Sequence, residues 1–342
     1  MSAIKQLLTT LFLLFLLICV GSYFPQWISR YYIQGFYPLL SAINQSLWAS
    51  IPFSLGDIGY LVAIVLIVKS LIRFSFRRQF WKALSVFSIA ILIFYSSWGL
   101  LYFKTPIREE RKLPNALTVS ALTETTTYYA NQLKEQHLAL SKSPQEPILI
   151  DVGTSDLLAL ATETMENSSL RPDKIHGKAK ATLFPTLLSY MGFGGYANPF
   201  THEAQVNTLQ PKLNILTTGC HEIAHQWGYA QEDEANYIGI KASINAANPL
   251  VAYAGNLLAF RYLINSLHSA DADQSQKIIA MLPGGVIAHI KESQSFWKYY
   301  QNPFEIVFEK SYDQYLKINK QKDGIKSYSL VVGLLVDDIS KL

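Results

Sequence analysis

Apolar residues are concentrated in three stretches near the start of the chain. Residues 7–24 form an uncharged run of 18, residues 83–103 form an uncharged run of 21, and residues 58–72 are apolar except for Lys69. A helix needs about 20 mostly apolar residues to cross a bilayer. The pattern therefore predicts three transmembrane helices, at about 7–24, 56–72 and 83–103.

The first apolar run has two other interpretations. It could be a cleaved signal peptide, or a lipoprotein signal in which Cys19 is acylated. No small-residue cleavage site follows the run, and the residues before Cys19 are large. We therefore expect an uncleaved span.

Basic residues cluster between the second and third predicted spans, in the segment 73–82. These are Arg73, Arg77, Arg78 and Lys82. Loops rich in Lys and Arg stay in the cytoplasm. The amino terminus is then cytoplasmic as well, and the segment 25–57 and everything after residue 103 are expected outside the membrane.

From residue 104 onward, apolar positions recur mainly three and four residues apart, which indicates helices. The predicted helices lie near 118–141, 154–167, 213–227, 231–246, 250–268 and 303–319. The better strand candidates are 148–153 and 196–207. We expect a mainly α (α+β) protein, in which residues 1–103 form a membrane anchor with three helices and residues 104–342 form an α-rich domain with a small sheet.

Composition and charge agree with this division. Half of the residues are hydrophobic and only 16% are charged, whereas soluble domains carry about 25% charged residues. This hydrophobic composition excludes intrinsic disorder. Residues 1–103 carry a net charge of +6 and the rest a net charge of −2. The sequence has no basic stripe of the kind that would predict a nucleic-acid partner. The two cysteines, Cys19 and Cys220, do not indicate a disulfide framework.

The clearest chemical motif is HExxH, formed by His221, Glu222 and His225. Residues four apart share one face of a helix, so both imidazoles can reach the same metal ion. Burying two histidines and a carboxylate in an apolar helix is costly without a partner such as a metal. Gly228 is placed to end this helix.

Four polar residues, at 231–234, follow where a third metal ligand is needed. On a second helix Glu232 would share its face with small residues, which allow close helix packing, whereas Glu234 would share its face with larger ones. We expect Glu232 as the ligand, with Glu234 as the alternative. Asn236, one turn further, would orient a histidine, unless it is a surface amide.

This arrangement predicts hydrolysis by a Zn²⁺-activated water, with Glu222 as the general base. Tyr253 is the first candidate for stabilising the oxyanion, and His202 is the second; packing is the competing role for both. Cys220 is expected in the core and not at the metal.

The motif resembles those of zincin metallopeptidases. Glu232, Ala235 and Asn236 are similar to the E-x-x-A-D of membrane-embedded gluzincins, although Asn236 replaces the aspartate and the gap after the HExxH helix is shorter. Gly228 fits the metzincin pattern HExxHxxGxxH, but Gln231 stands where that pattern has its third histidine.

The chain also resembles a bacterial membrane-protein family of unknown function. The resemblance is carried by IPFSLGD (51–57), WGLLYFKTPI (98–107), NPFTHEAQVN (198–207), CHEIAHQWGYAQEDEAN (220–236) and YLKINKQKDGIKSYSLVVGLL (315–335). It implies three amino-terminal membrane helices and a zincin-like domain, hence a multi-pass protein of the bacterial cytoplasmic (inner) membrane.

Two functions remain open. The first is a membrane-anchored zinc metallopeptidase that acts on peptide or protein substrates outside the cytoplasm. The second is a catalytically idle zinc-binding module with a structural or assembly role. The lipid bilayer is the other expected partner, and the sequence does not indicate an oligomeric state.

Overall fold

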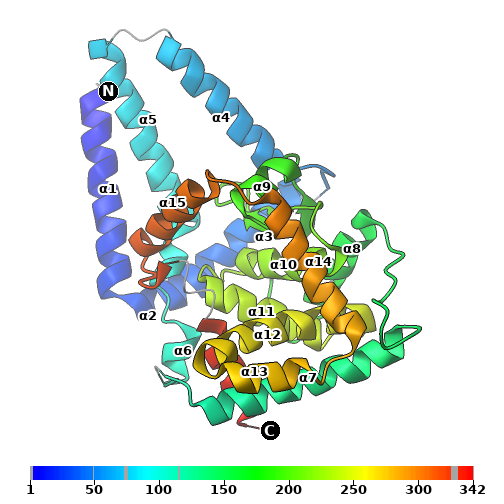
Figure 1. Cartoon of the computed structure of the whole chain (residues 1–342). Coiled ribbons are helices and arrows are strands. Elements are labelled where there is room, and N and C mark those ends of the chain that lie inside the picture. The colour runs from blue at the N-terminus through cyan, green and yellow to red at the C-terminus, as the bar shows by residue number, and fades with distance from the viewer. Residues whose placement is uncertain (1–2, 49, 73–75, 115, 325–329, 342) are drawn as a thin grey trace.

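The computed structural model describes residues 3–48, 50–72, 76–114, 116–324 and 330–341. Three long helices project from a mainly helical domain (Figure 1). They are α1 (Ala3–Tyr23), α4 (Leu55–Ile72) and α5 (Phe76–Ser97).

Two helices in the described part of the chain are long and apolar enough to cross a membrane. These candidate spans are Ile4–Tyr23 in α1 and Phe80–Ser97 in α5. The sequence prediction of three spans is thus supported for two, and the predicted span 56–72 is not among them.

The first turn of α4 is anchored in the helical domain by hydrogen bonds. Asp57, in the first turn, is 3% exposed and accepts hydrogen bonds from Thr182 Oγ1 at 2.8 Å, from Leu183 N at 2.7 Å and from Tyr196 Oη. This turn is therefore part of the helical domain. The part of α4 beyond this turn, from Ile58 to Ile72, is roughly 22 Å long, shorter than a hydrocarbon core of about 30 Å.

We predict that Asp57→Asn lowers the free energy of unfolding by about 1–3 kcal/mol. The neutral amide weakens the three hydrogen bonds and places an NH₂ group against donors. Urea unfolding of the detergent-solubilised protein measures the change. Asp173→Asn, at an exposed position, is the control and should alter stability by less than about 0.5 kcal/mol; equal effects would contradict the role of Asp57.

The third predicted span ends earlier than expected. Helix α5 stops at Ser97, and the next residues form a 3₁₀ helix, η2 (Gly99–Phe103), whose side chains are buried. Trp98 and Leu101 belong to the core of the domain. An apolar run does not distinguish lipid-facing from core-facing residues, and this is why 83–103 reads as one span.

Most of the segment predicted as a cytoplasmic loop, 73–82, belongs to the start of α5. Residues 73–75 of this segment lie outside the described residues.

The segment between α1 and α4 packs onto the domain. It contains α2 (Pro25–Trp27), a π-helix η1 (Ile28–Phe36) and α3 (Tyr37–Trp48). Tyr37 is fully buried and donates a hydrogen bond of 3.0 Å to the carbonyl of Gln226. This segment therefore supports the end of the HExxH helix.

The domain consists mainly of helices, and all six that the periodicity predicts are confirmed within two residues at either end. They are α7 (Val119–Leu140), α8 (Thr154–Glu166), α10 (Lys212–Gln226), α11 (Glu232–Ile244), α12 (Pro249–Ala270) and α15 (Glu305–Ile318). The prediction omitted α6 (Ile107–Glu110), α9 (Pro185–Met191), α13 (Ala272–Ile279), α14 (Gly284–Tyr300) and α16 (Val331–Ile339).

A small sheet lies beside the HExxH helix. Its strands β1 (Ala179–Ala181), β2 (Gly195–Ala197) and β3 (Ala204–Val206) are ordered β1-β3-β2. β3 pairs parallel with β1 and antiparallel with β2, where Gly195 faces Val206. The predicted strand at 196–207 is two strands, and the one predicted at 148–153 is not extended into a sheet.

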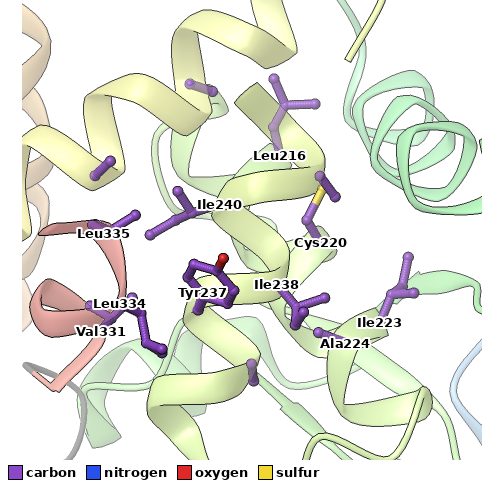
Figure 2. Close-up of a cluster of buried hydrophobic side chains, with 14 of the residues drawn as sticks. Leu216, Cys220, Ile223, Ala224, Tyr237, Ile238, Ile240, Val331, Leu334 and Leu335 are labelled. Atoms are coloured by element: carbon purple, nitrogen blue, oxygen red, sulfur yellow. The ribbon is translucent and has the colours of Figure 1, made fainter. Parts of the chain in front are cut away.

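One face of α10 lies in the core. Side chains from α10, α11 and α16 converge in one apolar cluster (Figure 2); they include Leu216, Cys220, Ile223, Ile240 and Leu334. Cys220 is a buried core residue, as the sequence predicts. The residues at 221, 222 and 225 lie on another face of the same helix.

Candidate metal centre

Close packing of α10 against α11 brings the candidate ligands together. A Cβ atom added to Gly239 would lie 3.0 Å from His221 N, so only glycine permits this approach of the two backbones. Gly228, with φ of 95°, reverses the chain between the helices. The small-residue face predicted for α11 is confirmed at this position.

Three ligand atoms converge in this region. Oε2 of Glu232 lies 3.2 Å from Nε2 of His221 and 3.4 Å from Nε2 of His225. One atom from each of the three residues lies within 4.8 Å of the others. His225 Nδ1 donates to the carbonyl of Tyr229 at 2.7 Å, which leaves its Nε2 directed at the carboxylate.

These residues fit a zinc ion. Ligand atoms in a tetrahedral zinc site, with bonds of about 2.0–2.1 Å, are roughly 3.3–3.4 Å apart. The separations from Glu232 to the two histidines match that value. Oε2 of Glu232 is buried and makes no hydrogen bond, as expected of an atom whose lone pair is directed at a cation.

The pKa values of Glu232 and His225 are shifted because the carboxylate and the imidazoles lie close together. Burial alone would raise the pKa of the Glu232 carboxyl, but His225 and His221 hold it well below its usual range. Burial alone would lower the pKa of His225, yet Glu232 raises it to about 9. Glu232 is therefore a carboxylate, the form that binds a metal.

Glu222 lies beside this group. Its side chain is 4% exposed, and burial raises its pKa to about 7 against the opposing effect of His221 and His225. A carboxyl group with a pKa near neutrality can accept and return a proton. Glu222 also faces strand β2, because a Cβ added to Gly195 would lie 2.8 Å from its Oε1.

A cavity of about 350 Å³ opens onto the site. His221 and Glu222 form part of its wall, together with Gly195 of the edge strand. Further lining side chains come from the start of α10 and from α12, α14 and α15. The cavity therefore connects the candidate ligands with a space that can hold a small part of a peptide.

Glu234, the alternative ligand, points elsewhere. It forms an ion pair of 3.4 Å with Lys104 and accepts a hydrogen bond of 2.6 Å from Ile107 N. Burial raises the pKa of its carboxyl group. It anchors the segment that connects α5 and η2 to the rest of the domain.

Asn236 lines the cavity, and its Nδ2 is buried without a hydrogen-bond partner. This position is consistent with the prediction from the sequence, which places Asn236 at the site, one turn after Glu232. It is not a surface amide, since 5% of the residue is exposed.

The two predicted oxyanion donors are not at the cavity. Tyr253 is fully buried, with its ring 5.8 Å from that of His289 and 6.2 Å from that of His137. His202 stacks on Tyr37. Neither residue is among those that line the cavity. Tyr253 lies roughly 13 Å along α12 from Tyr262, which does line it.

Sequence reasoning missed three residues at the site. Tyr312 of α15 donates a 2.6 Å hydrogen bond to Oε1 of Glu232. Tyr262 and Arg261 of α12 line the cavity. No motif marks them, because each comes from a helix far along the chain, although hydrophobic periodicity predicts both helices.

We predict that Gly239→Ala weakens zinc binding by about tenfold. The added methyl group lies against His221 N, so α10 must move away from α11 and the histidines from Glu232. Competition with a chromophoric chelator measures the affinity. Gly59→Ala is a matched control in another helix, where a Cβ has nothing within 4 Å; an equal loss in both variants would contradict this role of Gly239.

Comparison with known proteins identifies the family. No curated protein and no solved structure matches the chain, and nothing in the comparisons links the domain to zincins. Residues 32–336 match a family described as proteins of unknown function, DUF3810. The match includes the whole HExxH region and most of the helical domain, so the chain belongs to the DUF3810 family.

Proposed function

We propose that this protein is a membrane-anchored, zinc-dependent metallopeptidase. The observation that carries the proposal is the buried Oε2 of Glu232, which makes no hydrogen bond although Nε2 of His221 and of His225 lie at 3.2 and 3.4 Å. Two imidazole nitrogens and one carboxylate oxygen that converge at these separations match the ligand set of a zinc site. His221, His225 and Glu232 would hold it.

A zinc ion bound there would supply a Lewis acid that polarises a peptide carbonyl and lowers the pKa of a water molecule. Glu222 would take the proton of that water at its carboxylate and pass it to the leaving nitrogen. Its pKa of about 7 suits both transfers. Tyr312 would hold Glu232 in place through its hydrogen bond to Oε1.

Two further groups would act on the substrate. The edge strand β2 lies next to Glu222 and could align an extended peptide by adding it to the sheet. Tyr262 lines the cavity and takes the oxyanion-stabilising role that the sequence assigned to Tyr253. Burial raises the pKa of Tyr262 to about 12, so it remains a hydrogen-bond donor.

The proposed setting is the bacterial cytoplasmic membrane. The two apolar helices support attachment to a bilayer by their length and composition. The basic residues in the segment 73–82, three of which lie in the first turns of α5, favour a cytoplasmic position for that end of the helices. The helical domain, at their opposite end (Figure 1), would then lie outside the cytoplasm.

The test combines metal analysis with a cleavage assay. Full-length protein purified in detergent should contain about one zinc per chain and should cleave members of a broad peptide library, and a chelator should stop the cleavage. Zinc without cleavage of any peptide would favour the idle zinc-binding module. Protein without zinc after zinc supplementation would overturn both functions.

A further inference from the structure

The cavity at the candidate metal centre has a cationic wall. Arg261 of α12 lines it, together with Asn214 from the first turn of α10. Both side chains donate to Oγ of Ser293, Arg261 from Nη1 at 3.0 Å and Asn214 from Nδ2 at 2.8 Å. These bonds hold the guanidinium at a defined position.

The charge of Arg261 lacks a counter-ion. In the part of the chain that the structure describes, no carboxylate lies within 4.0 Å of its guanidinium, and the bond to Ser293 is its one hydrogen bond. A guanidinium carries several N–H donors and is always charged near neutral pH. Arg261 is half-buried and lines the cavity, so its remaining donors are available to a ligand there.

The position of Arg261 relative to the metal site sets the geometry of that ligand. Asn214, which shares Ser293 with Arg261, is seven residues before His221 on α10, roughly 10 Å along the helix axis. An extended peptide advances about 3.3–3.6 Å per residue. An anion at Arg261 would therefore be two or three residues away from a carbonyl at His221.

We propose that Arg261 binds a carboxylate of the substrate, two or three residues from the bond that is cleaved. A planar guanidinium matches a carboxylate through two parallel hydrogen bonds. The substrate class is thus an anionic peptide. This inference rests on the proposed function, because it takes the cavity as the substrate site.

The carboxylate has two possible sources, a free carboxyl terminus or an acidic side chain. The test separates them with three probes of equal length: N-acetyl-trialanine as the free acid, its carboxyl-terminal amide, and N-acetyl-Ala-Ala-Asp amide. Calorimetric titration of full-length Glu222→Gln protein in detergent measures binding without turnover. Each titration is repeated after zinc is removed by a chelator, because a carboxylate could also bind the metal.

We expect one or both anionic probes to bind at least about tenfold more tightly than the neutral amide, with and without zinc. Tight binding of the free acid alone would indicate that Arg261 recognises a free carboxyl terminus. Tight binding of the aspartyl amide alone would indicate that it recognises an acidic side chain. Arg261→Gln should remove the preference and Arg261→Lys should retain part of it. Arg171→Gln, which changes an arginine already paired with Glu166, should leave it intact.

Three results would overturn the inference: equal affinity for all three probes, absence of binding by all of them, or an anion preference that persists in Arg261→Gln. A preference seen only with zinc would also overturn it. Zinc content serves as the check that each variant folds. If the anion preference is found but wild-type protein cleaves no peptide, the carboxylate site stands and the peptidase function fails.

Discussion

Replacing Glu222 by glutamine should lower kcat for peptide cleavage by about 10²–10⁴-fold, with little change in KM or zinc content. Glutamine has nearly the same shape but cannot accept a proton. The carboxylate it replaces is 4% exposed, and burial raises its pKa to about 7. Steady-state kinetics on the best library peptide, with zinc measured on the same sample, provide both readouts.

Glu163→Gln is the matched control for this experiment. Glu163 is exposed on α8 and does not line the cavity, so kcat should stay at the wild-type value. Cleavage at the wild-type rate by Glu222→Gln, with zinc bound, would exclude Glu222 as the general base.

Glu232→Gln should abolish zinc-dependent stabilisation. A metal present at about 1,000 times its Kd stabilises the folded state by about 4 kcal/mol, which corresponds to a Tm shift of the order of 10 °C. The variant replaces the carboxylate that both histidines face with a neutral amide, a poor zinc ligand. Thermal scans with zinc and with chelator measure the shift in wild-type and variant protein.

Glu234→Gln, the same change two residues away, separates the two acidic candidates. Glu234 pairs with Lys104 and Ile107 N, so its substitution should lower the Tm in both conditions and leave the zinc-dependent difference intact. If instead Glu234→Gln loses that difference and Glu232→Gln keeps it, the ligand assignment is wrong.

The helices of the domain could be predicted well from the sequence, because an amphipathic helix carries its own periodic pattern. Two of the three predicted spans are supported as candidates, but the end of the last one could not be predicted. Leu100 and Leu101 continue the apolar run of α5 but are buried in the domain, and lipid and protein core select the same side chains. Asp57 could be identified as an anchor only from its partners Thr182 and Tyr196.

The candidate site shows the same limit. His221, Glu222 and His225 form a local motif, and the small residues of α11 favoured Glu232 over Glu234. Tyr253 does not line the cavity although Tyr262 of the same helix does, since helical spacing alone does not tell which turn of α12 meets the cavity. Tyr312 and Arg261 depend on how α15 and α12 pack against α10, which no local pattern encodes.

The segments before residue 103 enter the core of the helical domain, and this bears on whether proteolysis can separate the domain from them. Tyr37 and Trp98 precede the predicted boundary at 103, yet both are buried in the domain. A single proteolytic cut after Phe103 would leave these side chains on the amino-terminal fragment and open the core around α10. One such cut is therefore not expected to release an intact helical domain, and the candidate metal centre is expected to keep its geometry only while the segments before residue 103 stay attached.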